Sequence, residues 1–540
     1  MTTALAGAPW WQRGVVYQIY PLSFQDGNGD GIGDLAGIRS RLDHLVDLGA
    51  DAIWLSPIHP SPMHDHGYDV ADYEDVHPRF GTLAEFDAFV EAVHGRGLKL
   101  VLDLVANHTS HLHPWFVESR SSRDNPKRDW YIWRDPAPGG GPPNNWVSYF
   151  GSAWTLDELS GQYYFHQFRA EQPEVNYRNP DVAAAYRDIM RFWLRRGVDG
   201  FRADVIALMS KDDRFLDEPD DPAYVATEMA PYFSRIHLYT RDQPAVHEII
   251  RGMRRTLDEF PDRVLIGELD PTEHLMEFYG AGDECHLPFN FKLILEPWDP
   301  VVHRRLIDEY DAALPAGAWP NWVIGNHDRD RFVDRFGRRQ GRVAQMLVLT
   351  LRGTPIYYYG DEIGMPNGAV PPDAWSRIPE IDPPDPKRNR AESPRTPMQW
   401  TAGPNAGFCP PGVVPWMPIA AGHETINVEV ETRDPTSVLS LVRRLIELRR
   451  TSPALAVGAY RSIDPGADGL LAYERRLADD RFLVVLNYLD EPLEVALPGL
   501  DGRWTVALST ELDRPDEPAD RPLRLRANEG VILRAAPVAT

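Results

Sequence analysis

The sequence is poor in cysteine, in long apolar runs and in positive charge. Only two of its 540 residues are cysteine, Cys285 and Cys409; they allow one disulfide, but a reduced protein is the simpler expectation. No run approaches the roughly 18 apolar residues that a membrane-spanning helix needs, since the best one, 343–351, ends at Arg352. No basic segment precedes an apolar stretch at the start, so we expect no secretory signal and a cytoplasmic protein.

Acidic residues dominate the charge of the chain. Lysine and arginine total 56 and aspartate and glutamate total 80, which leaves a net charge of −24. That field repels a phosphate backbone, so nucleic acid is not expected as a partner, whereas neutral, cationic and metal-bound ligands stay open. Hydrophobic residues make up 43% and charged residues 25% of the chain, which is usual for a globular protein with a large core.

Short apolar runs alternate with helical periodicity along most of the chain. The runs predict strands at 15–20, 52–55, 99–105, 200–205, 264–268, 321–326 and 355–359, with a weaker one at 287–291. Helices are predicted at 34–48, from Thr82 to Gly97, and near 181–196, 245–260, 341–352 and 437–450. This alternation indicates a parallel sheet with crossovers. Eight such strands predict an α/β fold closed as a (β/α)8 TIM barrel, and a doubly wound open sheet is the alternative.

The alternation breaks in two places, which divides the chain. Residues 107–178 are rich in Trp, Pro, Asn and Gly. This stretch is too long for an ordinary loop, so we expect an inserted, loop-rich subdomain after the third strand. Beyond residue 456 the pattern changes to short strands with turns, which predicts a C-terminal all-β sandwich domain at 457–540. The catalytic barrel would then occupy 1–106 and 179–456.

Acidic residues stand at the carboxyl ends of four predicted strands: Asp103, Asp204, Glu268 and Asp328. In a barrel these ends converge on one mouth, where active sites lie. Two carboxylates about 5 Å apart can cleave a glycosidic bond with retention, one as nucleophile and one as acid/base. Aromatic residues of the insert suit the flat faces of sugars, although any single aromatic is more often packed in a core.

The segment Asp26–Asp34 is a candidate metal loop. It places side-chain oxygens at Asp26, Asn28, Asp30 and Asp34, with glycines between them. Alternate oxygen ligands with glycine at the sharp turn are what a Ca²⁺ loop needs, although the Glu that ends an EF-hand loop is missing. The alternative is a turn-rich loop that caps the helix beginning near Asp34. We expect a structural Ca²⁺ ion, for which Mg²⁺ could substitute.

Two histidine pairs and one glycine cluster resemble the sequence patterns of zinc sites and phosphate-binding loops. His64 with His66 and His111 with His113 have the spacing of zinc ligands. Neither pair lies on a strand beside a third ligand, so zinc is not expected there. The glycines of 27–33 have no lysine at the spacing of a P-loop, so phosphate binding is not expected either.

Six motifs occur in order along nearly the whole chain, each at a predicted strand end or in an adjacent loop. They are Gln18–Phe24, Asp103–His108, Gly200–Asp204, Gly267–Glu268, Asn326–Asp328 and Arg395–Trp400. Together they resemble the α-amylase family of glycoside hydrolases, in its α-glucosidase and oligo-1,6-glucosidase branch. The resemblance implies small α-glucosides as substrates, and it leaves open whether the protein is a monomer or a homo-oligomer.

The resemblance also implies a role for each carboxylate. Asp204 would be the nucleophile, Glu268 the general acid/base and Asp328 the stabiliser of the transition state. Arg202 lies two residues before Asp204 on the same face of the strand, so it can pair with that carboxylate and keep it ionised. The apolar run 264–267 can raise the pKa of Glu268 by desolvation, as an acid requires.

The same resemblance assigns the binding of the terminal glucose to five residues. They are Asp65, Tyr68, His108, His327 and Arg395. Tyr68 would stack on the sugar ring, and Arg395 would help to close the subsite. A closed end leaves no room for a further sugar, so cleavage from the non-reducing end, one glucose at a time, is expected. The family's calcium loop adds the carbonyl of Ile32 to the ligands.

Three positions bear on how closely the chain follows the family. Ala203 stands where a larger apolar residue is usual, and Thr401 stands where an Asp often follows the Met-Gln-Trp run. Val205, directly after Asp204, accompanies α-1,6 cleavage in this branch, whereas Ala or Thr accompanies α-1,4 cleavage. Hydrolysis of isomaltose-type bonds is therefore expected, with α-1,4 bonds and α,α-trehalose as further substrates.

Three other functions share features with this one. The same glycosyl-enzyme intermediate, passed to a sugar or an alcohol, would make a transglucosidase or a disaccharide isomerase. A non-catalytic binding subunit of this fold typically loses the catalytic acids and carries a membrane span, whereas this chain keeps Asp204, Glu268 and Asp328. A metal-dependent barrel hydrolase would use the histidine pairs. The sequence favours hydrolysis by the three carboxylates.

Overall fold

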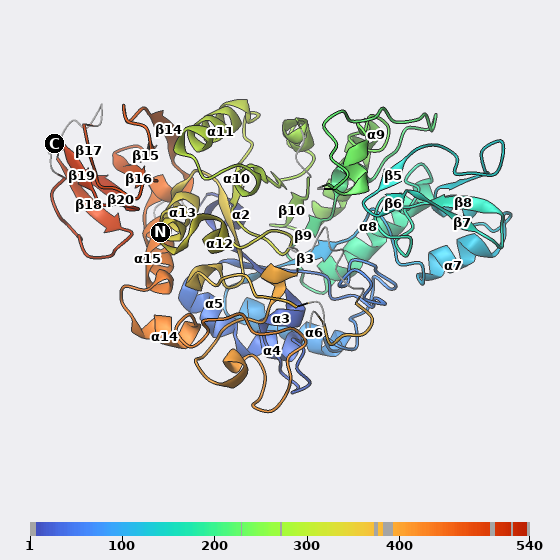
Figure 1. The fold of residues 1–540 in the computed structure, drawn as a ribbon, viewed down its shortest axis with the longest axis horizontal. Helices are drawn as coiled ribbons and strands as arrows, with labels where there is room; N and C mark the ends of the chain where they lie inside the picture. Colours follow the sequence, from blue (N-terminus) through green and yellow to red (C-terminus); the bar gives the residue numbers. More distant parts are fainter. Residues whose placement is uncertain are drawn as a thin grey trace.

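The centre of the molecule is a parallel sheet of eight strands (Figure 1). The structure is a computed structural model that describes residues 7–227, 229–269, 273–371, 376–381, 392–496, 503–519 and 522–536. Within these residues the strand order is β11-β10-β9-β3-β2-β1-β13-β12. The bounds are Val16–Ile19 (β1), Ala52–Leu55 (β2), Lys99–Leu104 (β3), Gly200–Ala203 (β9), Val264–Gly267 (β10), Leu287–Pro288 (β11), Asn321–Val323 (β12) and Thr354–Tyr358 (β13).

The two outermost strands of this sheet, β11 and β12, are bridged by one side chain. The amide of Asn321 donates to the Pro288 carbonyl (2.6 Å) and accepts from the backbone N–H of Asn290 (3.0 Å). These bonds satisfy backbone groups that an open edge would leave unpaired. The sheet therefore closes on itself, which confirms the predicted (β/α)8 barrel, including its weak eighth strand, and excludes the doubly wound alternative.

Helices follow the strands around the outside of the barrel (Figure 1). The longer ones are Leu83–Gly95 (α6), Pro180–Arg195 (α8), Ala245–Leu257 (α9), Pro300–Ala313 (α11), Arg338–Thr350 (α13) and Val438–Thr451 (α15). α6 opens with the capping box of Thr82 and Glu85 that its sequence predicts. The single helix predicted at 34–48 is wrong: α4 (Leu35–Ser40) and α5 (Leu42–Leu48) are separated by Arg41, whose guanidinium stacks 4.3 Å from the Trp400 ring.

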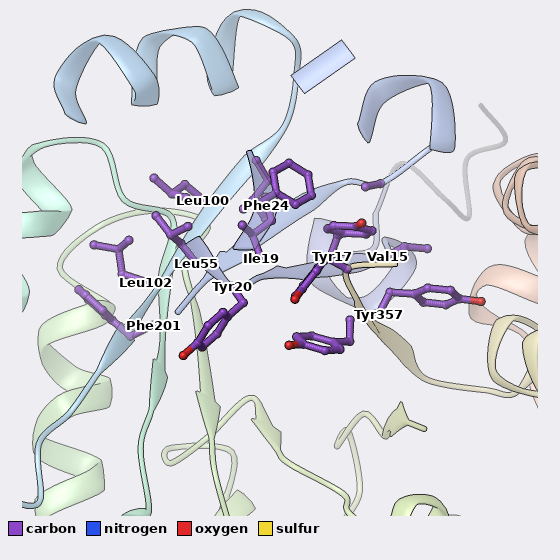
Figure 2. Packing of buried hydrophobic residues seen from close by; sticks show 14 of the residues in the cluster. Val15, Tyr17, Ile19, Tyr20, Phe24, Leu55, Leu100, Leu102, Phe201 and Tyr357 are labelled. Carbon is purple, nitrogen blue, oxygen red and sulfur yellow. The ribbon is translucent and has the colours of Figure 1, made fainter. Parts of the chain in front are cut away.

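Side chains alternate along each strand between the barrel interior and the layer of helices. Val16 and Trp54 belong to the cluster inside the barrel. Tyr17, Ile19 and Leu55 belong to the cluster that packs outward against the helices, part of which Figure 2 shows. Because both faces of the sheet are buried, the strands are almost wholly apolar. The acidic side chains Asp103, Asp204 and Glu268 lie at the carboxyl ends, where the barrel opens.

The insert after β3 is a small unit with its own packing. It contains α7 (Pro114–Ser121), a three-stranded antiparallel sheet and a short hairpin. The sheet is formed by Trp133–Arg134 (β4), Trp154–Asp157 (β7) and Gln162–Phe165 (β8), and the hairpin by Val147–Ser148 (β5) and Gly151–Ser152 (β6). Its core gathers Ile132, Trp146, Trp154 and Phe165. Trp146 and Trp154 therefore serve the packing of the insert.

The C-terminal domain is all β. Its five-stranded antiparallel sheet has the order β14-β15-β16-β20-β18, and a second sheet pairs β17 with β19. The strands are Ala459–Ile463 (β14), Leu470–Leu477 (β15), Asp480–Asn487 (β16), Leu493–Val495 (β17), Trp504–Ser509 (β18), Leu523–Leu525 (β19) and Gly530–Ala535 (β20). The predicted all-β domain is confirmed. Figure 1 places it and the insert at opposite ends of the longest axis, with the barrel between them.

Two expectations from composition can be compared with the structure. Cys285 and Cys409 are both buried, free thiols, as the simpler of the two expectations requires. In the ranges given above, no helix combines the length and the apolar character that crossing a membrane demands. The exact domain limits stay predictions.

Candidate active site

Arg202 holds three carboxylates together at the carboxyl end of the barrel. Its Nη1 lies 2.7 Å from Asp103 Oδ1 and 2.6 Å from Asp204 Oδ1, and its Nη2 lies 2.5 Å from Glu268 Oε1. The carboxylates come from β3, from the end of β9 and from the end of β10, which are neighbours in the sheet. Three acids far apart in sequence thus share one guanidinium because parallel strands end at the same mouth.

Burial and the charge of Arg202 give Glu268 and Asp204 different pKa values, so that only one of them is protonated near neutral pH. Burial raises the pKa of Glu268 well above its ordinary value against the opposing charge of Arg202, and the neighbouring Asp204 carboxylate raises it further. Burial also raises the pKa of Asp204, to about 6, while Arg202 and a hydrogen bond with Glu268 act to lower it. The pair therefore favours a protonated Glu268 that donates to an ionised Asp204 near neutral pH.

The turn after Asp204 is fitted closely to Glu268. The backbone N–H of Val205 donates to Glu268 Oε2 (3.1 Å), and the N–H of Ile206 donates to the Glu268 carbonyl (3.1 Å). Gly267 has no room for a side chain, since a Cβ there would lie 2.4 Å from the Ile206 side chain and 2.6 Å from Cys285 Sγ. Glycine before Glu268 is thus a packing requirement, which brings the ends of β9 and β10 close together.

Asp328 is held by a second set of partners. Arg395 donates from Nη2 to Asp328 Oδ1 (2.7 Å) and from Nε to the His327 carbonyl (2.9 Å). His327 Nε2 lies 3.2 Å from Asp328 Oδ2. Burial acts to raise the pKa of Asp328, but the charges of His327, Arg395 and Arg202 outweigh it and lower that pKa far below its usual range. Asp328 is therefore ionised near neutral pH.

His327 and Tyr68 connect the two sets of partners. Their rings stack with centroids 5.5 Å apart, and the Tyr68 hydroxyl lies 3.1 Å from His327 Nε2 while it donates to Asp103 Oδ2 (3.1 Å). Gln18 Nε2 lies 2.9 Å from His327 Nδ1. Burial lowers the pKa of His327 to about 4, so its imidazole is neutral near pH 7 and can both donate and accept hydrogen bonds.

The remaining predicted binding residues line the side of the site that faces the insert. Gln172 donates from Nε2 to Asp65 Oδ2 (2.9 Å) and lies 3.1 Å from His108 Nε2. His108 Nε2 also lies 3.1 Å from the Tyr68 carbonyl. The structure thus brings every predicted catalytic and glucose-binding side chain into one connected network, with Val205 joining it through its backbone.

Several members of the network were not predicted from the sequence. Gln18 lies inside a motif that the sequence analysis singled out, so a role for it could have been argued there, whereas Asp103 was predicted at the mouth as a strand-end acid but was given no role of its own. Gln172 has no such signal, because only the fold of the insert carries it back to His108. Arg395 Nη1 also lies 3.6 Å from Glu392 Oε1, three residues earlier along the chain.

The proposed metal loop is closed by hydrogen bonds to its own backbone. Asp26 Oδ2 accepts from the N–H of Gly31 (2.9 Å), and Asp34 Oδ2 accepts from the N–H of Asn28 (3.1 Å). Asp34 Oδ1 accepts from Gly37 at the start of α4 (2.6 Å), so the helix-capping role that was the alternative is present. Asn28 and Asp30 are joined by a side-chain contact of 3.2 Å at the surface. Ile32 lies within the same loop.

The histidine pairs go to separate partners. His66 contacts the Tyr20 hydroxyl (2.8 Å) and Glu392 (3.3 Å), and His113 accepts from the Trp115 N–H at the start of α7 (3.1 Å). His64 and His111 have ring centroids 5.8 Å apart. In the part of the chain that the structure describes, no cluster of three or more His, Cys, Asp or Glu residues has a metal-binding arrangement.

Comparison with known proteins places this site in a family. Residues 18–458 match the family model described as the alpha amylase catalytic domain. The chain is 40% identical over 516 residues to a probable alpha-glucosidase of Rhizobium meliloti, covering 91% of each chain. It is 38% identical over 528 residues to an oligo-1,6-glucosidase of Parageobacillus thermoglucosidasius, covering 91% of this chain and 92% of that one.

A solved structure agrees with these relatives. It is an alpha-glucosyl transfer enzyme with 38% identity and a TM-score of 0.90, and the match covers 98% of this chain and all of the other. The family match extends over most of the chain, and the likeness includes the barrel, the insert and the C-terminal domain. This chain therefore belongs to the alpha-amylase family of glycoside hydrolases.

Proposed function

We propose that this protein is an exo-acting, retaining α-glucosidase that releases glucose from the non-reducing end of short α-glucosides. The observation that carries the proposal is the sharing of Arg202 by Asp204 and Glu268, with 2.6 Å and 2.5 Å contacts. Two acids joined in this way have unequal pKa values, which suits one as nucleophile and the other as proton donor.

The chemistry is a double displacement. The ionised carboxylate of Asp204 attacks the anomeric carbon while Glu268 gives its proton to the glycosidic oxygen, and the aglycone departs as an alcohol. Water then attacks the glucosyl ester, Glu268 takes a proton from that water, and the Asp204 carboxylate is released with glucose. Asp328, anionic throughout, favours the positive charge that develops on the sugar ring.

Retention follows from how near the two acids lie. An inverting enzyme separates its carboxyl groups by about 6.5–9.5 Å to admit a water between them, whereas a retaining enzyme uses about 5–5.5 Å. Asp204 and Glu268 contact the two terminal nitrogens of one guanidinium, at 2.6 Å and 2.5 Å, which supports the shorter separation of a retaining enzyme. Proton NMR of early hydrolysis products tests this: α-glucose must appear first, and β-glucose would exclude the mechanism.

Cleavage from the chain end is supported by the interlocked residues around the first glucose. Arg395, Asp328, His327 and Tyr68 are joined by contacts of 2.7–3.2 Å, and Gln172 links Asp65 to His108 on the other side. Because these side chains are joined to one another, they form a closed end to the site. The hydrogen-bonding groups that they have left can serve only one sugar ring. Free glucose should therefore be the first product from longer α-glucosides.

The linkage preference that we propose is α-1,6, with α-1,4 and α,α-1,1 bonds as further substrates. It rests on Val205 in the sequence and on the relative named an oligo-1,6-glucosidase. One methyl group decides only about 1–3 kcal/mol, so α-1,4 cleavage is expected alongside. A product profile over isomaltose, maltose and trehalose tests this, and maltose cleaved faster than isomaltose would contradict it.

Transfer to a second sugar is the alternative use of the same intermediate. The solved alpha-glucosyl transfer enzyme is as similar to this chain as the hydrolytic relatives are. The ratio of free glucose to transfer products from maltose separates the two functions. We propose that hydrolysis prevails, because relatives that are 38–40% identical over most of the chain are named glucosidases.

We further propose a structural Ca²⁺ ion at the loop of Asp26, Asn28, Asp30 and Asp34, with the Ile32 carbonyl as an added ligand and Mg²⁺ as a possible substitute. Alternating oxygen donors on a glycine-rich turn support it, and Asp26 and Asp34 are already buried near each other. Chelation should lower the melting temperature and leave turnover at moderate temperature unchanged, since an ion that binds only the folded state stabilises it.

The cellular setting is also a proposal. A cytoplasmic enzyme acting on small α-glucosides, as a monomer or homo-oligomer, fits the pair of free thiols. The acidic surface that the net charge of −24 produces disfavours nucleic acid as a partner. Fractionation of cells that express the tagged protein tests the compartment.

A further inference from the structure

The turn that binds Glu268 has a strained backbone. Val205 has φ 38° and ψ 47°, in the left-handed region that β-branched residues avoid. This conformation directs the N–H groups of Val205 and Ile206 toward Glu268, at 3.1 Å each. A residue held in such a region persists only where its surroundings fix it. Contacts outside the turn must therefore keep it in place.

A buried ion pair supplies one such contact. Lys211 Nζ pairs with Glu174 Oε1, and it also donates to the carbonyl of Leu208. Leu208 is the last residue of η2 (Ile206–Leu208), the short helix that starts directly after Val205. Lys211 is 4% exposed and Glu174 is 1% exposed, and the Phe165 ring lies 5.4 Å from Nζ. Charges buried this deeply are tolerated only when paired.

Glu174 belongs to the opposite wall of the site. Its residue forms an antiparallel bridge with His108, and the N–H of the following Val175 donates to the Asn107 carbonyl (3.1 Å). The Glu174 N–H donates to the carbonyl of Phe165 in the insert (3.0 Å). The ion pair therefore ties the turn that binds Glu268 to the segment that carries His108.

We propose that Lys211 and Glu174 are positioning residues, whose buried ion pair holds the strained turn, and through it Glu268, in register with the glucose-binding wall at His108. The inference rests on the proposed function, because it assumes that Glu268 protonates the leaving group. In the described structure Lys211 and Glu174 contact the turn and the wall, and their effect on catalysis passes through Val205 and His108.

The test compares Lys211→Met, Glu174→Gln and the double variant on two substrates. Isomaltose needs a proton on its leaving oxygen, whereas p-nitrophenyl α-glucoside releases a stable phenolate without one. A displaced acid should therefore lower kcat/KM for isomaltose about 100-fold, the size of effect that a misplacement of about 1 Å produces. The loss of kcat/KM for p-nitrophenyl α-glucoside, which reports the first displacement alone, should be at least tenfold smaller. A merely structural role would lower both rates equally.

If a single variant does not fold, the double variant still allows the two rates to be compared. Each single change leaves one buried charge unpaired, but Lys211→Met with Glu174→Gln removes both charges. We expect the double variant to regain the wild-type melting temperature while it keeps the selective loss on isomaltose. Recovery of the wild-type kcat/KM on isomaltose in the double variant would overturn the inference, because the two charges would then do no more than compensate each other in the interior.

A control ion pair of lysine with an acid, Lys99 with Asp199, lies at the amino ends of β3 and β9, away from the active site. Lys99 begins β3 and lies 3.1 Å from Asp199, which precedes β9. Lys99→Met should lower the melting temperature without changing the ratio of the two rates. An inactive wild-type enzyme would overturn both this inference and the proposed function. An active one in which Lys211→Met slows both substrates equally would overturn the inference alone.

Discussion

Replacing Glu268 by glutamine separates the two halves of the proposed reaction. The amide has nearly the shape of the carboxyl group but cannot give or take a proton. Glu268 has a partner at each oxygen: Oε1 forms an ion pair with Arg202 (2.5 Å), and Oε2 accepts from the Val205 N–H (3.1 Å). The glutamine amide can accept only one of these, so one donor will face an NH2 group.

The expected magnitude has two parts. General acid–base catalysis is worth about 10²–10⁴ in rate, which is about 3–5 kcal/mol at 1.36 kcal/mol per factor of ten. The donor left without an acceptor costs about 1–3 kcal/mol of folding free energy, which a large barrel can lose and remain folded. We therefore expect Glu268→Gln to cleave isomaltose about 10³-fold more slowly than the wild type, with a modestly lower melting temperature.

The assay is a rapid-mixing measurement with p-nitrophenyl α-glucoside. Its phenolate leaves without a proton, so the first displacement stays fast, whereas hydrolysis of the glucosyl ester lacks its base. A burst of nitrophenolate equal to the enzyme concentration should precede a slow steady state. Azide, which attacks without needing a base, should restore turnover and yield glucosyl azide. Near-wild-type cleavage of isomaltose, or slow turnover with neither burst nor azide rescue, would refute the assignment of Glu268.

Three other predictions follow from the same geometry. Asp204→Asn should lose at least about 10³ in rate on both substrates, with no burst, because no glucosyl ester can form; retained activity in a steady-state assay would exclude Asp204 as nucleophile. The pH profile of kcat/KM should be bell-shaped. The rate should fall as pH drops through about 6, where burial places the pKa of Asp204, and fall again at higher pH as Glu268 loses its proton. A pH-independent rate between pH 4 and 7 would contradict this. Asp34→Ala should destabilise the fold by about 1 kcal/mol through loss of the helix cap to Gly37, as measured by urea unfolding, and should leave kcat unchanged; unchanged stability would show that the cap is not used.

Much of the barrel could be predicted because strand patterns are local. Residues 52–55 were predicted as a strand and are one, and 99–105 and 264–268 each differ by one residue at the end. Both faces of these strands are buried, so their apolar runs are continuous and easily recognised. The helix predicted at 34–48 is interrupted at Arg41, whose backbone leaves the helical region (φ −108°, ψ 7°). Its side chain stacks on Trp400 from a distant loop, a contact that no local pattern contains.

The candidate site was predictable where a motif carries it. Asp204, Glu268 and Asp328 follow strands, so their convergence is a consequence of the parallel barrel. The hydrogen bond from Gln172 to Asp65, at 2.9 Å, is different. It depends on the path of the insert, whose irregular backbone has no periodicity from which that path could be deduced.

The amino-acid sequence alone thus determined the class of fold, the identity of the acids and the order in which they occur, because hydrophobic periodicity and strand-end residues are properties of short segments. Only the tertiary structure decided that one guanidinium serves three carboxylates and that a valine adopts a left-handed backbone to reach Glu268. It likewise decided that Lys211 and Glu174 meet. These features depend on segments that are remote in sequence, and burial changes the pKa of a group only after the chain has closed around it.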